Sequence, residues 1–379
     1  MNRLRSLDVF RGLTIALMIL VNSPGNRVAY SWLEHSDWNG CTLADLVFPF
    51  FIVMVGTSSV FALSSLQRRG VATSVLIKKI LTRGLSIFLI GLLLNAFPKH
   101  WNIFDLRLLG VLQRIALCYI VTALLFLSTT RRQQGGIIAV LLAGYWLLMS
   151  RFSLAADDNL VGYIDRLLLS SRHLYTPGFD PEGLLSTVPA IASALLGNLL
   201  GYCLISDEDK QKQLRWILSA GVLFMALGAA WAMFFPINKA LWSSSYVLWT
   251  SGLAYLTFAL CFVLVDMKHW SAWAKPFELF GRNAMLVYVL HVVFLKIQAV
   301  IRVHDSHGDL VSLRLYITDR LFGFLSPYNA SLCYALMYTL LWLLVLKAIA
   351  MARRLNYTEH RRAEIASSAS ISPSPAKKR

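Results

Sequence analysis

The sequence predicts an all-α, polytopic membrane protein with about ten transmembrane helices. Hydrophobic residues make up 57% of the 379-residue chain and charged residues only 15%, whereas soluble domains carry about 25% charged residues. Long apolar stretches recur along the whole chain, each near the ~20 residues that a helix needs to cross a bilayer. Because these stretches far exceed the length of a strand, they favour helices over a β-barrel.

Ten stretches meet this expectation, with polar or basic residues between them. In order they are residues 9–21, 44–66, 77–96, 106–127, 137–152, 184–205, 216–235, 246–265, 279–300 and 332–351. A long polar segment, 156–183, separates the halves, and segment 304–327 is expected to lie along the membrane interface. We expect one transmembrane domain over residues 1–356. Residues 357–379 are rich in Ser, Pro, Ala, Lys and Arg, which predicts a disordered basic tail.

The formal charge of +16 is best explained by membrane orientation. Lys and Arg are concentrated in alternate loops and in the tail, as in proteins whose cytoplasmic loops collect positive residues. This pattern predicts that both termini are cytoplasmic and that the loop around His35 faces the other side. In a bacterium the protein would lie in the inner membrane with that loop in the periplasm. We therefore expect the lipid bilayer, not nucleic acid, as the surrounding partner.

Several chemistries lack their sequence signals. None of the five cysteines forms a Cys-x-x-Cys pair, so we predict neither a metal site nor a disulfide framework. No Gly-x-Gly-x-x-Gly, Walker loop or His-Glu-x-x-His motif is present, which argues against nucleotide hydrolysis and zinc chemistry. The basic N-terminus resembles a signal peptide, but Asp8 and Arg11 in the helix entry predict that it stays attached.

The first 60 residues concentrate the polar chemistry in a loop between two predicted spans. This loop contains a His, carboxylates, amides and Trp residues. It is larger and more polar than a plain connection requires. We interpret it as the mouth of an active site.

Several sequence blocks resemble the heparan-α-glucosaminide N-acetyltransferase family. They are Arg3-Leu4-Arg5-Ser6-Leu7-Asp8-x-Phe10-Arg11-Gly12, His35-Ser36-x-Trp38-Asn39-Gly40, Ala44-Asp45-Leu46-Val47-Phe48-Pro49, Gly110-Val111-Leu112-Gln113-Arg114, Phe179-Asp180-Pro181-Glu182-Gly183-Leu184-Leu185, Asn238-Lys239-x-Leu241-Trp242-Ser243 and Asn283-x-x-x-Val287-Tyr288-Val289-x-His291. The blocks occur in the family's order and cover nearly the whole chain. Lysosomal members carry an extra luminal domain. We expect a bacterial homologue without it, of the type labelled N-acetylglucosamine-operon transport-related.

The resemblance implies acetyl transfer across a membrane, from cytoplasmic acetyl-CoA to the amine of a glucosamine-type sugar in the periplasm. For the phosphates of coenzyme A we expect contacts from Arg3, Arg5 and Arg11, since guanidinium groups bind phosphate in bidentate fashion. These arginines also fit simple membrane anchors. Gln113 and Arg114 lie inside a predicted span, where a charge usually faces a polar cavity or a partner. We expect them beside the pantetheine arm, or else in a buried structural pair.

His35, Asn22 and Asp45 are the candidate catalytic residues. A histidine can accept a proton from the attacking amine or carry the acetyl group itself. Its alternative role is a loop histidine bonded to a nearby carboxylate. Asn22 is a candidate oxyanion donor or a helix-ending residue, and Asp45 either orients His35 or caps the second helix.

A sugar site is expected on the same side, built from carboxylates, a cation and an aromatic ring. The candidate residues are Asp180, Glu182, Asn238, Lys239, Trp242 and His291. Turn chemistry would also explain the Asp-Pro-Glu-Gly sequence, and His291 could make an interhelical bond. The alternative function is transport of N-acetylglucosamine or its oligomers. That function favours two related halves, and we find no convincing repeat. A homodimer is compatible with either function.

Overall fold

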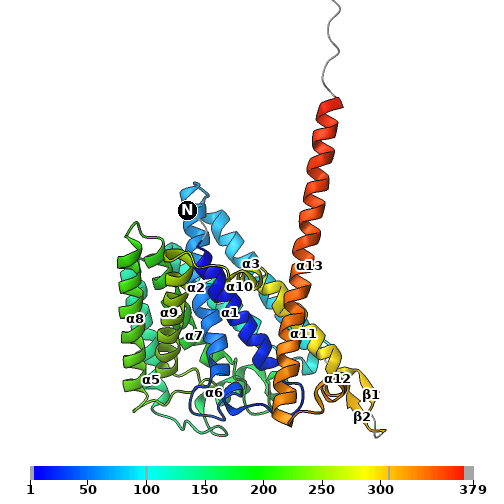
Figure 1. Cartoon of the computed structure of the whole chain (residues 1–379). Coiled ribbons are helices and arrows are strands. Elements are labelled where there is room, and N and C mark those ends of the chain that lie inside the picture. Colours follow the sequence, from blue (N-terminus) through cyan, green and yellow to red (C-terminus); the bar gives the residue numbers. More distant parts are fainter. Residues whose placement is uncertain (1–3, 99–100, 306–307, 371–379) are drawn as a thin grey trace, which may run out of the picture.

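The computed structural model describes residues 4–98, 101–305 and 308–370. Long helices form a bundle, and the described residues contain a single two-stranded hairpin, β1 Arg302–His304 with β2 Leu310–Ser312 (Figure 1). The predicted all-α fold class is confirmed.

Six described helices are long and apolar enough to cross a membrane. They are α2 Leu43–Arg68, α4 Val111–Ser128, α7 Leu184–Leu204, α8 Lys210–Trp231, α9 Ser244–Cys261 with its π-helical extension η4 Phe262–Met267, and α13 Pro327–Ser370. The pair α10 Lys275–Arg282 and α11 Ala284–Val300 passes the same criterion together but bends by 82°. The chain is thus a multi-pass membrane protein.

The other three predicted spans also form helices, although they fall outside this set of candidate spans. They are α1 Arg5–Asn22, α3 Thr73–Ala96 and α5 Arg131–Met149. Each has two or more charged residues in its first half. Every one of the ten predicted spans therefore coincides with a helix, and six or seven of them meet the membrane criterion.

The bend between α10 and α11 interrupts the span predicted over residues 279–300. Asn283 leaves the helical region, with φ −115° and ψ 23°. Its side-chain amide donates to the carbonyl of Leu279 at 2.9 Å, and its backbone N–H donates to Phe280 instead. The side chain thus replaces the backbone bond that an unbroken helix would make, and the local ladder stops here.

Two helix pairs approach so closely that only glycine fits between them. On α2 and α7, a Cβ added to Gly56 would lie 1.9 Å from the carbonyl oxygen of Ala194, and one on Gly197 would lie 2.0 Å from that of Val53. α1 and α10 are joined in the same way through Gly12 and Gly281. Small residues at such crossings let membrane helices pack by backbone contact. These contacts fix α1, α2 and α10, which carry much of the site.

The polar segments gather at the end of the bundle that holds the α1–α2 loop. Segment 156–183 forms α6 Leu160–Leu169 and η3 Ser171–His173, and residues 302–322 form the hairpin and α12 Leu313–Phe322. α6, α12 and the hairpin lie at the lower end in Figure 1, opposite the start of α1. η1 Ser31–Leu33 and η2 Ile103–Asp105 are further short turns.

α13 continues past residue 357, where the sequence predicted a disordered tail, and reaches Ser370. Arg, Glu and Ala in this stretch are strong helix formers. The division at residue 357 stays a prediction, and residues 371–379 lie outside the described part.

Candidate active site

Helices α1, α2, α3, α4, α10 and α11 line a cavity of about 420 Å³. At one end it is lined by Arg11, Arg83 and Arg282, which we call the arginine end. At the other end it is lined by Asn22, His35, Glu182 and Lys239, which we call the histidine end. Arg11 and Asn22 both lie on α1, so at 1.5 Å per residue the two ends are about 16 Å apart along that helix.

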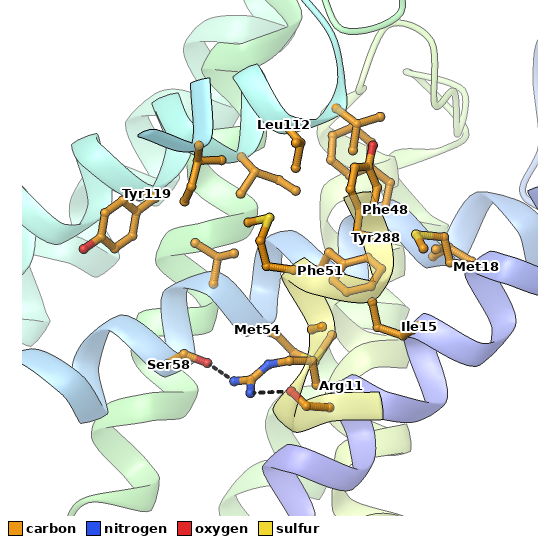
Figure 2. Close-up of a pocket in the computed structure, with 18 of the residues that line it drawn as sticks. Arg11, Ile15, Met18, Phe48, Phe51, Met54, Ser58, Leu112, Tyr119 and Tyr288 are labelled. Carbon is orange, nitrogen blue, oxygen red and sulfur yellow. Dashed lines mark hydrogen bonds between the residues drawn. The ribbon is translucent and has the colours of Figure 1, made fainter. Parts of the chain in front are cut away.

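The middle of the cavity is apolar. Figure 2 shows the side chains that line it from α1, α2, α4 and α11. They include Ile15, Met18, Phe48, Phe51, Met54, Leu112 and Tyr288. A charged group would lose its hydration here without replacement. The middle therefore suits a thin, uncharged chain, and a charged group is suited only to the ends.

The arginine end is built from helices. Arg11 donates to the Ser58 hydroxyl at 2.5 Å and to the carbonyl of Gly281 at 3.3 Å (Figure 2), and it pairs with Asp8 at 3.3 Å. The Arg83 guanidinium lies 5.1 Å from the centre of the Tyr119 ring. These contacts hold the guanidinium groups in place at the cavity wall.

Arg282 completes the arginine end from the bend between α10 and α11. It pairs with Glu278 at 3.3 Å and lies 3.9 Å from Asp8. Arg5 also pairs with Glu278, at 2.9 Å through Nε, and does not line the cavity. Arg3 lies outside the described residues. Of the three arginines predicted to contact phosphate, Arg11 lines the cavity. Arg83 and Arg282, which were not predicted, line the same end.

The histidine end is centred on a hydrogen bond of 2.8 Å between His35 Nδ1 and Asp45 Oδ1. Asp45 is completely buried. Its second oxygen accepts the backbone N–H groups of Ser36 at 3.1 Å and Thr42 at 3.0 Å. Asp45 therefore both orients His35 and completes a capping box at the start of α2.

The tautomer of His35 is assigned from its bond to Asp45. An ionised carboxylate only accepts hydrogen bonds, so Nδ1 carries the proton and Nε2 keeps its lone pair. The His35 side chain is 51% exposed and lines the cavity, so a substrate can approach the ring. This is the arrangement that a general base or an acetyl carrier needs.

Lys239 lies against this pair. Its Nζ is 3.2 Å from Asp45 Oδ1, 2.9 Å from His35 Nδ1 and 3.3 Å from His35 Nε2. Burial lowers the pKa of Lys239, and the charge of Asp45 opposes that shift. Asn22, the last residue of α1, is exposed and lines the same end.

The two predicted carboxylates of the sugar site have different positions. Asp180 is completely buried and forms a two-point pair with Arg107, through Nε at 2.9 Å and an Nη at 2.7 Å. Glu182 also pairs with Arg107, at 2.5 Å, but lines the cavity where Asp180 does not. Arg107, which the sequence analysis did not single out, holds both carboxylates.

Four other residues of the predicted site lie behind the cavity wall: Arg114, Gln113, Trp242 and His291. Arg114 is completely buried, donates to the carbonyl of Gly183 at 3.2 Å and to the Ser186 hydroxyl, and lies 5.0 Å from the ring of Trp242. Gln113 and His291 are also buried, and none of the four is among the lining residues.

Asn238 precedes Lys239 in the chain, and its side chain makes hydrogen bonds that stabilise the loop between α8 and α9. Its Oδ1 accepts the N–H of Leu241 at 2.8 Å, and its amide donates to Asn39 at 3.1 Å. Asn238 thus ties the Lys239 turn to the His35 loop.

Neither Arg83 nor Arg282 was among the phosphate contacts expected from the sequence. A signal for Arg282 exists in retrospect: Gly281-Arg282-Asn283 is a polar break inside an apolar stretch. Within the described ranges, no group of three or more His, Cys, Asp or Glu side chains is placed to hold a metal ion.

Comparison with known proteins gives one family. Residues 3–239 match a family model described as heparan-alpha-glucosaminide N-acetyltransferase, catalytic. A mouse protein named heparan-alpha-glucosaminide N-acetyltransferase is 32% identical over 357 residues, which are 77% of this chain and 54% of the mouse protein. The human protein of that name is 30% identical over 385 residues, or 83% and 57% of the two chains. The chain thus spans little more than half the length of these relatives.

Proposed function

The chain belongs to the heparan-α-glucosaminide N-acetyltransferase family, and from this we propose that it is a membrane-embedded acetyltransferase. It moves acetyl from cytoplasmic acetyl-CoA to the amine of a glucosamine-type sugar on the periplasmic side of a bacterial inner membrane. The observation that carries this proposal is the single cavity that joins three guanidinium groups to His35. A donor bound at one end can therefore meet an acceptor at the other.

The donor's chemistry matches the order of the cavity wall. Its phosphates suit the arginine end, where Arg11, Arg83 and Arg282 lie together. Its pantetheine arm is uncharged and thin, which suits the apolar middle. Since phosphate cannot be desolvated at reasonable cost, only the arm and its thioester enter. The thioester then reaches His35.

His35 Nε2 is the proposed base. It takes a proton from the sugar's amine as the nitrogen attacks the thioester carbon, the C–S bond breaks, and the proton passes to the departing thiolate. Asp45 holds the tautomer and stabilises the imidazolium. Asn22 lines the same end of the cavity, and we propose that its amide N–H donates to the developing oxyanion. A two-step route through acetylated Nε2 uses the same nitrogen.

For the sugar we propose contacts at the mouth of the histidine end. Glu182 lines the cavity and can receive hydroxyl or amine hydrogens. Asp180, Asn238 and Trp242 are proposed to support the mouth from behind, because their polar atoms bond within the protein. We propose cytoplasmic termini on the basis of the Lys and Arg distribution. A surrounding lipid bilayer and a homodimer are predictions from the sequence. The cavity itself is built from one chain.

The test is transfer of labelled acetyl from acetyl-CoA to glucosamine by the purified protein in proteoliposomes. We expect labelled N-acetylglucosamine, absent from liposomes without the protein. If neither glucosamine nor another amino sugar is acetylated, the proposal fails. Uptake of labelled N-acetylglucosamine by the same vesicles would then favour the transporter.

A further inference from the structure

Lys239 contacts both members of the His35–Asp45 pair instead of extending into the cavity. Its Nζ lies 2.9 Å and 3.3 Å from the two ring nitrogens of His35 and 3.2 Å from the carboxylate of Asp45. The side chain is only 19% exposed. A lysine that served only to bind sugar would not need these contacts.

The turn that carries Lys239 is fixed to the His35 loop. Asn238 bonds to Asn39, and the N–H of Gly40 donates to the carbonyl of Ile237 at 2.8 Å. The N–H of Asn238 also donates to the Ser243 hydroxyl at 3.0 Å. The backbone that carries Lys239 is therefore fixed on both sides, and the contacts with His35 and Asp45 hold the ammonium group.

The charges around His35 come from three elements. Asp45 lies on α2, Lys239 precedes α9, and Glu182 lies before α7 at the same end of the cavity. Glu34 is the neighbour of His35 on its own loop and accepts the N–H of Ala29. Asp45 alone would favour the imidazolium form of His35, because an opposite charge at hydrogen-bond distance stabilises the charged form. The ammonium of Lys239, equally close, has the opposite effect.

We propose that Lys239 is a positioning residue that keeps His35 unprotonated at neutral pH, so that Nε2 is free to accept a proton. Lys239 and Asp45 form a neutral pair around the imidazole, and Asp45 can fix the tautomer without charging the ring. The lowered pKa of Lys239 agrees with its burial, which Asp45 partly offsets. This role rests on the proposed function, where His35 is the base.

The direct test is the titration of His35 in Lys239→Met and Lys239→Arg. Diethyl pyrocarbonate modifies unprotonated imidazole, and mass spectrometry of the peptide with residue 35 measures the reaction against pH. In Lys239→Met we expect the midpoint to rise by about one pH unit or more, the usual size of such a charge effect. Lys239→Arg keeps the charge and should stay near the wild-type midpoint.

An unmoved midpoint in Lys239→Met, or an equal rise in Lys239→Arg, would overturn the proposal. Lys239→Gln provides a second neutral variant if the Met variant fails to fold. Since the labelling needs neither acetyl-CoA nor sugar, its outcome does not depend on whether the protein is an acetyltransferase.

Kinetics distinguish a positioning role from a sugar contact. If Lys239 keeps His35 unprotonated, the Met variant should lose kcat at neutral pH, and the acid limb of its pH–rate profile should move to higher pH. KM for the sugar should change little. A raised KM with an unmoved acid limb would instead make Lys239 a sugar contact and contradict the inference.

Discussion

The two ends of the cavity differ in composition and in construction. The arginine end presents three guanidinium groups from helices α1, α3 and α10. The histidine end is a compact set of acid, base and cation, in which Asp45, His35 and Lys239 lie within 3.3 Å of one another. Most of its groups come from loops and helix ends.

This difference indicates a division of labour. An excess of positive charge on rigid helices suits the binding of a polyanion, which must be held but not changed. A closely paired acid and base suits proton transfer, where tautomer and charge must be controlled. The apolar middle keeps the two environments apart. Variants at one end should therefore affect chemistry, and variants at the other should affect donor affinity.

The largest effect is expected from His35→Ala. Loss of a general base costs about 10²–10⁴ in rate, so turnover should fall at least a hundredfold, or vanish if His35 carries the acetyl group. Acetyl-CoA affinity, measured by calorimetry, should stay near wild type. Asp37→Ala, an exposed change in the same loop, is the control and should keep its activity. Near-normal turnover of His35→Ala would remove His35 from the mechanism.

A smaller effect is expected from Arg11→Ala, and it concerns the affinity for acetyl-CoA instead of the chemical step. Loss of a charge-assisted hydrogen bond costs about 1.5–3 kcal/mol, so acetyl-CoA should bind roughly tenfold more weakly or worse. Lys78→Ala is the matched control, because Lys78 is exposed and does not line the cavity. Equal affinities in Arg11→Ala and wild type would mean that the phosphates bind elsewhere.

The smallest effect is expected on thermal stability, and it concerns Asp165 on α6, near the histidine end. Its Oδ1 accepts the N–H of Leu184 at 2.8 Å, and burial raises its pKa to about 6. Because the folded-state pKa lies above the unfolded value, the stability linked to this proton is present at low pH. It is lost as pH rises through about 6.

Asp165→Asn does not titrate and keeps the acceptor oxygen. Its Tm should be close to wild type at about pH 3 and higher than wild type by a few degrees at about pH 8. Thermal unfolding in detergent measures both values. A Tm difference that does not change with pH would show that Asp165 does not resist ionisation in the fold.

Local sequence features predicted the helices and part of the histidine end. Apolar length and helical period act within one segment, so all ten predicted stretches were recognisable as helices, of which six or seven meet the membrane criterion. The contact of Asp45 with His35 was one of two options, and the structure realises both because the carboxylate has two oxygens. Thr42 and Asp45 are close in sequence, which made the capping box visible.

Contacts between distant segments were not predictable in this way. Arg107 binds Asp180 across 73 positions, and Arg282 reaches the cavity only because the helix breaks at Asn283. Arg114 and Trp242 pack against each other behind the cavity wall. In the sequence, the two side chains are notable only as a charged and an aromatic residue in apolar surroundings. A single sequence marks such residues as unusual but does not state which face of the bundle they occupy.

The most direct measurement confines the two substrates to opposite sides of the membrane. Oriented proteoliposomes receive labelled acetyl-CoA on the side of the arginine end and glucosamine on the other side. We predict that labelled N-acetylglucosamine accumulates on the glucosamine side, and that none forms when both substrates are on the arginine side. Product formed with both substrates on the arginine side alone would contradict transfer through the cavity.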